Sequence, residues 1–250
     1  MHAVLQEIYD SGKVYDSKGV SYDLADSIEP REAAFIDQLI HEHPHIRRTL
    51  EIGCAYGISS LTICHAVSGR SDVKHTIIDP FQYSQWRGIG VENLRRAGLH
   101  DWELIERKSE HALPALDERN DKKYEFILID GWHTFDHTLI DSFYATRLLA
   151  KGGILVVDDV NFPAVRMLIN HLLTYPCYQL IGSVDRPRPM SGRQKILQSF
   201  ASLIPRSKRE QFLPPYVCQL VESDEKQSLM VALLKIDADQ RNWDWHENFC

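Results

Sequence analysis

The segment LEIGCAYGISSL, residues 50–61, joins an expected strand to an expected helix through two glycines. Gly53 would let the backbone turn tightly and approach a ligand, and Gly57 would allow close packing of the helix against the strand. The glycines lie four positions apart, which differs from the GxGxxG spacing that binds a pyrophosphate. Glu51 in the strand would repel a pyrophosphate but could meet a cationic amino-acid group. Because glycines are common in such turns, a purely structural role remains the alternative.

Strands and helices alternate on both sides of this turn, as is typical of a doubly wound, mostly parallel α/β sheet of the Rossmann-like kind. The apolar run 124–130 is expected to be a central strand that is buried on both faces. Gly152 is expected to cap the helix 135–150. The expected strands are 49–53, 75–79, 102–106, 124–130, 153–159, 178–184 and 229–236, and the helices between them are 59–67, 91–97, 110–116, 135–150 and 164–173.

Two segments depart from the alternation. Residues 1–45 are expected to form an N-terminal helical segment with a turn-rich middle at 10–19 and a helix from Pro30 to about His43, before a domain at 46–250. Residues 185–228 form an insertion before the last strand, long enough to predict a lid or subunit contact. Between 185 and 212 it carries seven Lys or Arg residues and two acids. These basic residues, Arg186 among them, would meet an anionic part of a substrate, unless the segment is only a solvated connector.

Composition excludes several classes of protein. The net charge of −7 argues against a surface built for nucleic acid. No apolar run approaches the ~20 residues of a membrane span. The N-terminus lacks the basic start and apolar region of a secretory signal, and five scattered cysteines indicate neither a zinc site nor a disulfide framework. We therefore expect a cytoplasmic protein without membrane or nucleic-acid partners.

Acidic residues end several of the expected parallel strands. Asp79 follows the second strand, where an acid can bind the two ribose hydroxyls of an adenosine-type ligand. Asp130, Asp158 and Asp159 end the fourth and fifth strands and should meet at the same edge of the sheet. Three converging carboxylates would repel one another without a cation, and oxygen ligands favour Mg²⁺ or Mn²⁺. The alternative is that these aspartates only cap turns.

His133 lies three residues after Asp130, near the start of a helix. The positive end of a helix disfavours imidazolium, so we expect a neutral side chain that can accept a proton.

Together, LEIGCAYG, the acid of IIDP and the YEFILID strand followed by LLAKGGILVVDD resemble the class I S-adenosylmethionine (SAM)-dependent methyltransferases. Within that class, D-x-x-H followed by a DD pair resembles the metal-dependent O-methyltransferases of the catechol and macrolide-sugar type. In the catechol enzymes a lysine stands where this chain has His133. The long insertion departs from those small enzymes and puts a simple catechol substrate in doubt.

The resemblance implies a seven-stranded sheet with a reversed last strand and a set of site residues. Asp130 and His133 would be catalytic, and Asp130, Asp158 and Asp159 would hold the metal. The residues implied to bind SAM are Glu51, Gly53, Ala55, Tyr56, Gly57, Asp79, Ser109, Glu110 and Asp130, with Ser109 and Glu110 near the adenine.

The expected activity is therefore the SAM-dependent methylation of a hydroxyl group on a small molecule such as a sugar, polyketide or phenolic diol. The expected assembly is a monomer or a homo-oligomer. The alternatives are a metal-independent methyltransferase and a non-catalytic protein of the same fold that binds the cofactor.

Overall fold

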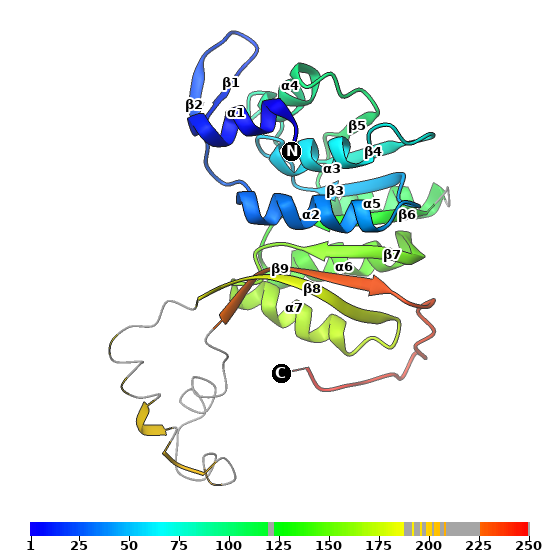
Figure 1. The fold of residues 1–250 in the computed structure, drawn as a ribbon. Coiled ribbons are helices and arrows are strands. Elements are labelled where there is room, and N and C mark those ends of the chain that lie inside the picture. Colours follow the sequence, from blue (N-terminus) through cyan, green and yellow to red (C-terminus); the bar gives the residue numbers. More distant parts are fainter. Residues whose placement is uncertain are drawn as a thin grey trace.

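A seven-stranded sheet runs through the middle of the molecule (Figure 1). The structure, a computed structural model, describes residues 1–119, 123–187, 192, 196, 199–201, 203–205, 208 and 226–249. The strand order is β5-β4-β3-β6-β7-β9-β8, and β9 is antiparallel to both of its neighbours. The expected doubly wound sheet with a reversed last strand is thus confirmed. The strands are β3 (Arg48–Ile52), β4 (Lys74–Ile78), β5 (Trp102–Ile105), β6 (Tyr124–Ile129), β7 (Leu149–Val157), β8 (Tyr178–Pro187) and β9 (Lys226–Lys235).

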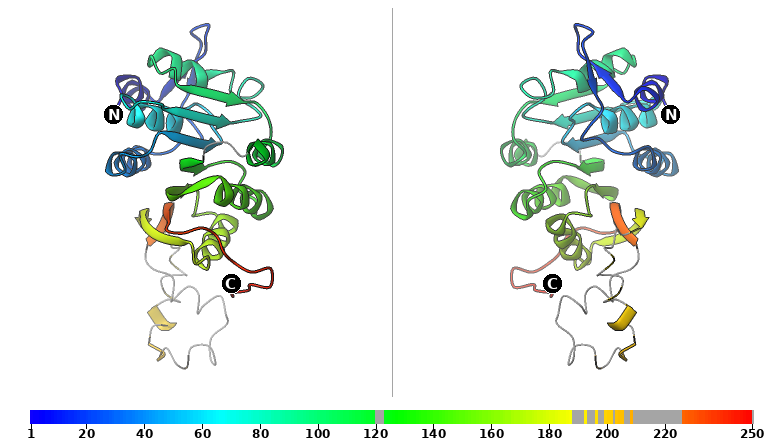
Figure 2. Two further views of the ribbon diagram at one scale, coloured as in Figure 1. Left: turned by 90° about the vertical axis from the view of Figure 1, so that its right-hand side faces the viewer. Right: turned by 90° about the vertical axis from the view of Figure 1, so that its left-hand side faces the viewer.

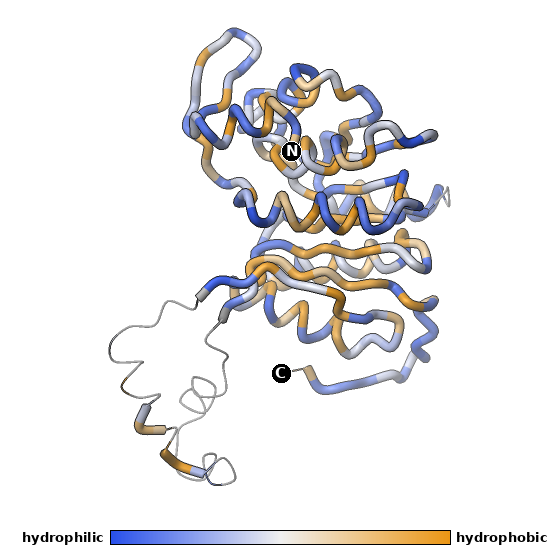
Figure 3. The backbone as a smooth tube through the Cα atoms, viewed as in Figure 1, coloured by the Kyte–Doolittle hydropathy of each residue, from blue (hydrophilic) through white to orange (hydrophobic). Residues whose placement is uncertain are grey.

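Helices cover both faces of the sheet (Figure 2). One apolar cluster joins one face to α1 (Ala3–Ser11), α2 (Pro30–Glu42), α3 (Ile58–Val67) and α4 (Ile89–Arg96). A second cluster joins the other face to α5 (Ser109–Arg119), α6 (Phe135–Leu148) and α7 (Pro163–Leu173). Apolar residues concentrate along the central strands between these layers (Figure 3), which explains the near-continuous apolar run in β6. None of the described helices is long and apolar enough to span a membrane.

The N-terminal segment has a helix on each side of a middle stretch that contains the expected turns. Between α1 and α2 the chain forms a hairpin of β1 (Lys13–Tyr15) and β2 (Ser21–Asp23). The Asp16 carboxylate accepts the backbone N–H groups of Lys18 and Val20, at 2.9 Å each, and so stabilises the turn. The expected helix at Pro30 is present, with Pro30 in its first turn.

Gly152 does not cap a helix, contrary to the prediction. Helix α6 ends at Leu148, and Gly152 lies inside β7 with a φ of 81°. The pairing of β7 with β6 shifts register between Tyr124 and Phe126. The positive φ of Gly152 therefore accommodates an irregularity in β7.

The predicted insertion begins and ends inside strands. Asp185 pairs with Ser228 and Arg186 with Gln227, so β8 and β9 extend further than expected. Most of residues 188–225, including Arg188, Arg193 and Leu197, lie outside the described residues, and the lid or subunit contact stays a prediction. The described cysteines Cys54, Cys64 and Cys177 are free and buried, as expected.

The ends of β3 and β6 approach each other very closely. A Cβ atom on Gly53, whose φ is 91°, would lie 1.9 Å from the carbonyl oxygen of Asp130. No side chain fits there, so the glycine at the end of β3 is a steric requirement. This contact fixes the turn after β3 against the acidic end of β6.

We predict that Gly53→Ala destabilises the protein by at least about 3 kcal/mol or prevents folding, because the methyl group must displace backbone. Urea unfolding monitored by circular dichroism measures the change. Gly69→Ala is the matched control, since Gly69 also has a positive φ of 81° but has no atom within 4 Å of the added Cβ. Similar losses in both variants would contradict the steric argument.

Candidate active site

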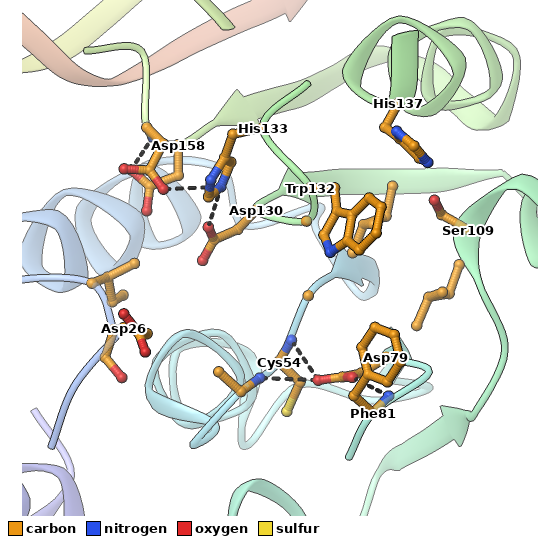
Figure 4. Close-up of a pocket in the computed structure, with 18 of the residues that line it drawn as sticks. Asp26, Cys54, Asp79, Phe81, Ser109, Asp130, Trp132, His133, His137 and Asp158 are labelled. Atoms are coloured by element: carbon orange, nitrogen blue, oxygen red, sulfur yellow. Dashed lines mark hydrogen bonds and ion pairs between the residues drawn. The ribbon is translucent and has the colours of Figure 1, made fainter. Parts of the chain in front are cut away.

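A cavity of about 550 Å³ opens at the carboxyl ends of the parallel strands (Figure 4). Its wall combines the turns after β3, β4, β6 and β7 with residues 26–29 and Glu32 of the N-terminal segment. The wall also includes Arg186 of β8 and Leu229 of β9. The predicted site residues that line it are Gly53, Ala55, Asp79, Ser109, Glu110, Asp130, His133, Asp158 and Asp159.

Asp79 organises the turn after β3. Its Oδ2 accepts the backbone N–H groups of Cys54 (3.2 Å) and Ala55 (3.0 Å), and its Oδ1 accepts that of Phe81 (2.8 Å). Burial raises the pKa of this carboxyl, and the three backbone N–H groups oppose the rise. The Asp79 carboxylate is therefore held in one orientation at the wall of the cavity.

Aromatic and polar side chains surround the space beside Asp79. Phe81 and Trp132 line it, and Trp132 packs edge to face against His137 with ring centroids 4.9 Å apart. Ser109 and Glu110, from the first turn of α5, complete this side. A flat ring could stack here beside hydroxyl-binding groups, which is what an adenosine requires.

Three residues expected to bind the cofactor do not line the cavity. Glu51 is fully buried beneath the turn, where it accepts hydrogen bonds from Ser60 and from His75 Nε2 (3.2 Å). Tyr56 is buried against Trp86, with ring centroids 5.1 Å apart. Gly57 is the N-cap of α3, and an added Cβ would lie 2.7 Å from the carbonyl oxygen of Gly90 in α4. The geometry thus favours supporting roles for Glu51, Tyr56 and Gly57 over direct contact with a ligand.

A carboxylate–imidazole cluster occupies the other end of the cavity. His133 Nε2 lies 2.9 Å from Asp159 Oδ2 and 3.9 Å from Asp130 Oδ1. The His133 ring also stacks on Phe162 at 5.1 Å. Asp159 has a left-handed backbone with a φ of 56°, an unusual conformation that directs the end of β7 into the cluster.

Asp158 stands apart from these three residues, although it lines the same cavity. Its Oδ1 accepts the backbone N–H of Asp159 at 2.8 Å. Burial and the neighbouring carboxyls of Asp130 and Glu32 raise the pKa of Asp158 to about 10. In the structure as it stands, Asp158 therefore holds a proton at neutral pH.

His133 is positively charged in this setting, contrary to the prediction. The carboxylates of Asp130 and Asp159 raise the pKa of His133 to about 10, which outweighs the effect of burial. Helix α6 begins only at Phe135, after Thr134. Two adjacent carboxylates thus decide the charge of the imidazole, and the helix terminus does not.

The cluster has the chemistry of a cation site. Asp130, His133 and Asp159 each offer a ligand atom within 4.8 Å of the others. His133 Nε2 is shielded from solvent and, among the described residues, has no hydrogen-bond partner of good geometry despite its ion pairs. The crowded carboxylates of Asp130 and Asp159 fit a divalent cation, whereas His133 can join them as a ligand only after it loses its proton. The set differs from the predicted trio, because His133 takes the place of Asp158.

The sequence interpretation missed the N-terminal contribution to the cavity. Asp26, Glu29 and Glu32 all line it. Glu32 is buried, and burial with the charges of Glu29 and Asp159 raises its pKa. One signal was available, because Glu32 lies one turn before Ile36 on the apolar face of α2, where an acid is out of place.

One comparison with known proteins covers the part of the chain that contains both Asp79 and the cluster of Asp130, His133 and Asp159. Residues 50–160 match the protein family described as "Methyltransferase domain". The chain contains a methyltransferase domain. No curated protein sequence is significantly similar to this methyltransferase.

Solved structures share the fold over 94% of the methyltransferase chain. An O-methyltransferase from Bacillus cereus in complex with SAH has 15% identity, 92% of that chain covered and a TM-score of 0.62. TomG from Streptomyces achromogenes, an O-methyltransferase involved in tomaymycin synthesis and bound to SAM, has 17% identity, with 91% of that chain covered and a TM-score of 0.61. Cofactor-bound Rv0187 from MTB has 15% identity, with 89% of that chain covered and a TM-score of 0.60. The predicted class I methyltransferase fold and the expectation of an enzyme are confirmed.

We predict that the stability of the metal-free methyltransferase falls as the pH rises from about 5 to 9. Asp158 binds its proton more tightly in the folded state than in the unfolded chain, where its pKa is about 3.9. The folded state therefore binds more protons across this window, and raising the pH favours unfolding. Asp158→Asn removes the titration and should flatten the decline. At pH 8 a gain on the order of 1 kcal/mol would raise Tm by about 2–4 °C.

Thermal unfolding between pH 5 and 9 in the presence of a chelator measures this dependence. Asp136→Asn is the control, because Asp136 is an exposed acid with a lowered pKa. Identical pH dependence in the wild type and Asp158→Asn would contradict the assignment of a buried, protonated Asp158.

Proposed function

We propose that this methyltransferase transfers a methyl group from SAM to a hydroxyl of a small molecule, assisted by a divalent cation. The observation that carries the proposal is that one cavity joins the Asp79 turn to the cluster of Asp130, His133 and Asp159. O-methyltransferases that hold SAM or SAH share the fold. The acidic cavity and the net charge of −7 favour a small acceptor over a nucleic acid.

The Asp79 end of the cavity suits the nucleoside of SAM. Asp79 Oδ2 accepts from Cys54, Ala55 and, at 3.4 Å, from Gln82, whereas Oδ1 accepts only from Phe81 among the described residues. A carboxylate oxygen has two lone pairs, so Oδ1 can accept one ribose hydroxyl in addition. Phe81 and Trp132 offer ring surfaces for the adenine, and Ser109 and Glu110 offer polar contacts at its edge. The methionine part would lie over Gly53 and Ala55, toward Asp130.

Asp130 and Asp159 would hold the cation, and Asp158 remains the predicted third ligand once it loses its proton. When bound, Mg²⁺ or Mn²⁺ supplies charge neutralisation and lowers the pKa of a neighbouring hydroxyl. Neutralising the two carboxylates removes the cause of the raised pKa of His133. The imidazole then returns toward its ordinary range, in which it can accept a proton.

The chain would contribute positioning and proton transfer to the reaction. A sulfonium methyl group is already activated, so the main tasks are to align the acceptor oxygen and remove its proton. His133 Nε2 faces the position between Asp130 and Asp159 and would take that proton. Phe162 and the segment at residues 26–32 would exclude water as charge is neutralised between sulfonium and oxyanion.

Two alternatives remain, and metal dependence with turnover separates them. A metal-independent methyltransferase would retain full turnover after chelation. A non-catalytic cofactor-binding protein would bind SAM without transferring its methyl group to any sugar or phenolic diol, with or without metal.

We predict that Asp79→Ala weakens SAH binding roughly 10- to 150-fold, because a charge-assisted hydrogen bond contributes about 1.5–3 kcal/mol. Isothermal titration calorimetry measures the affinity. Asp79→Asn separates the lost charge from damage to the turn, because it keeps the shape of the side chain. Asp37→Ala, which removes an acid outside the cavity wall, is the control. Unchanged affinity in a folded Asp79→Ala protein would refute the ribose assignment.

We also predict that chelation of divalent cations lowers turnover at least about 100-fold and that Mg²⁺ or Mn²⁺ restores it. The double variant Asp130→Asn with Asp159→Asn should lose Mn²⁺ binding in calorimetry. Asp136→Asn should keep it, because Asp136 is an exposed acid outside the cavity wall. Full turnover in excess chelator would favour the metal-independent alternative.

A further inference from the structure

Arg186 is a cation in the cavity wall without a counter-ion among the described residues. Its side chain lines the cavity, and the arginine ion pairs of the described chain do not include it. Its Nε is shielded from solvent and has no hydrogen-bond partner in that part of the chain. A buried guanidinium N–H without a partner is costly, because the group loses its hydration and gains nothing in exchange. This N–H is therefore available to a ligand that enters the cavity.

The sheet order places Arg186 at the end of the cavity remote from Asp79. From β4 to β8 the carboxyl edge carries Asp79, then Gly53, Asp130, Asp158 and, beyond β9, Arg186. Because β9 is antiparallel to both β7 and β8, the C-terminal end of β8 lies at this same edge. Strands are about 4.8 Å apart, so β8 lies roughly 10 Å beyond β7.

Hydrogen bonds on both sides fix the backbone that carries Arg186. Arg186 pairs with Gln227 in β9, and Gln227 Nε2 donates to the carbonyl of Asn161 at 3.0 Å. Arg31 of α2 donates to the carbonyl of Asp185 at 3.2 Å. The strands that carry Arg186 are therefore hydrogen-bonded both to the turn after β7 and to α2.

We propose that Arg186 determines acceptor specificity by binding an anionic group of the acceptor, a carboxylate or a phosphate. This inference rests on the proposed function. A guanidinium binds either oxyanion through two parallel hydrogen bonds. The acceptor would place its hydroxyl at Asp130, His133 and Asp159 and its anionic group roughly 10 Å further along the cavity, at Arg186.

The acidic surroundings sharpen this selectivity. Asp26 and Glu29 also line the cavity, so an anionic group placed elsewhere would meet like charge. The negative charge of an acceptor increases its affinity only when the distance between its hydroxyl and its oxyanion matches the distance between the cluster and Arg186. An uncharged diol would leave Arg186 unpartnered, which disfavours a simple catechol.

The first test uses inorganic phosphate as the probe and requires neither SAM nor turnover. In ¹⁵N NMR of the full-length protein at constant ionic strength, the Nε–H signal of Arg186, assigned by its loss in Arg186→Lys, should shift saturably with phosphate. The signal of Arg95, an exposed arginine of α4 outside the cavity wall, should not. Arg186→Gln should weaken phosphate binding at least about 10-fold, and Arg95→Gln should not. Absence of a saturable shift at Arg186, or equal shifts at both arginines, would overturn the proposal.

The second test separates acceptor recognition from the chemical step. With a methyl acceptor that carries an oxyanion, Arg186→Ala should raise the acceptor KM at least about 10-fold and leave the KM of SAM unchanged. With a neutral ester or amide of the same acceptor, the variant should match the wild type. Equal effects on charged and neutral acceptors would show a merely structural role. Failure of the proposed function would appear separately, as absent SAH binding or absent turnover in the wild type.

Discussion

The close approach of β3 and β6 is the constraint on which the site depends. The backbone at Gly53 leaves no room for a Cβ atom beside the carbonyl of Asp130. Because of this contact, the turn held by Asp79 and the carboxylates that follow β6 and β7 line the same cavity. Because the two strands are adjacent and parallel in the sheet, their ends stay in register, and a donor and an acceptor of a methyl group can meet between them.

Charge is the second organising factor, and it opposes stability. Asp130, Asp158, Asp159 and Glu32 converge on a small volume that a folded chain would avoid on energetic grounds alone. Protons on Asp158 and His133 relieve the repulsion in the structure as described. A divalent cation would relieve it more completely, so protons and metal would compete for the same carboxylates. The left-handed backbone of Asp159, which aspartate tolerates in turns, adds a small local cost at the same place.

The sequence predicted the elements of this arrangement better than their interactions. Asp79, Asp130, Asp158 and Asp159 could be placed together because the carboxyl ends of parallel strands share one edge. The charge of His133 depends on side-chain distances to two carboxylates, which spacing along the chain does not contain. Glu32 reaches the cavity through the packing of α2 on the sheet, a tertiary contact between segments far apart in sequence. The turn of the hairpin β1–β2 lies in the stretch expected to be rich in turns, but its strands were missed because they have only three residues each.

The walls of the cavity divide between separate parts of the chain. The side with Asp79 comes from residues 50–133, whereas Asp26, Glu32, Arg186 and Leu229 come from segments that precede or follow this stretch. Substitutions in these outer segments can reshape the acceptor side without disturbing the contact between Gly53 and Asp130. The arrangement is modular, so exchanging the outer segments between relatives could change which acceptor is preferred, in evolution or by engineering. The side of the cavity with Asp79 would stay the same.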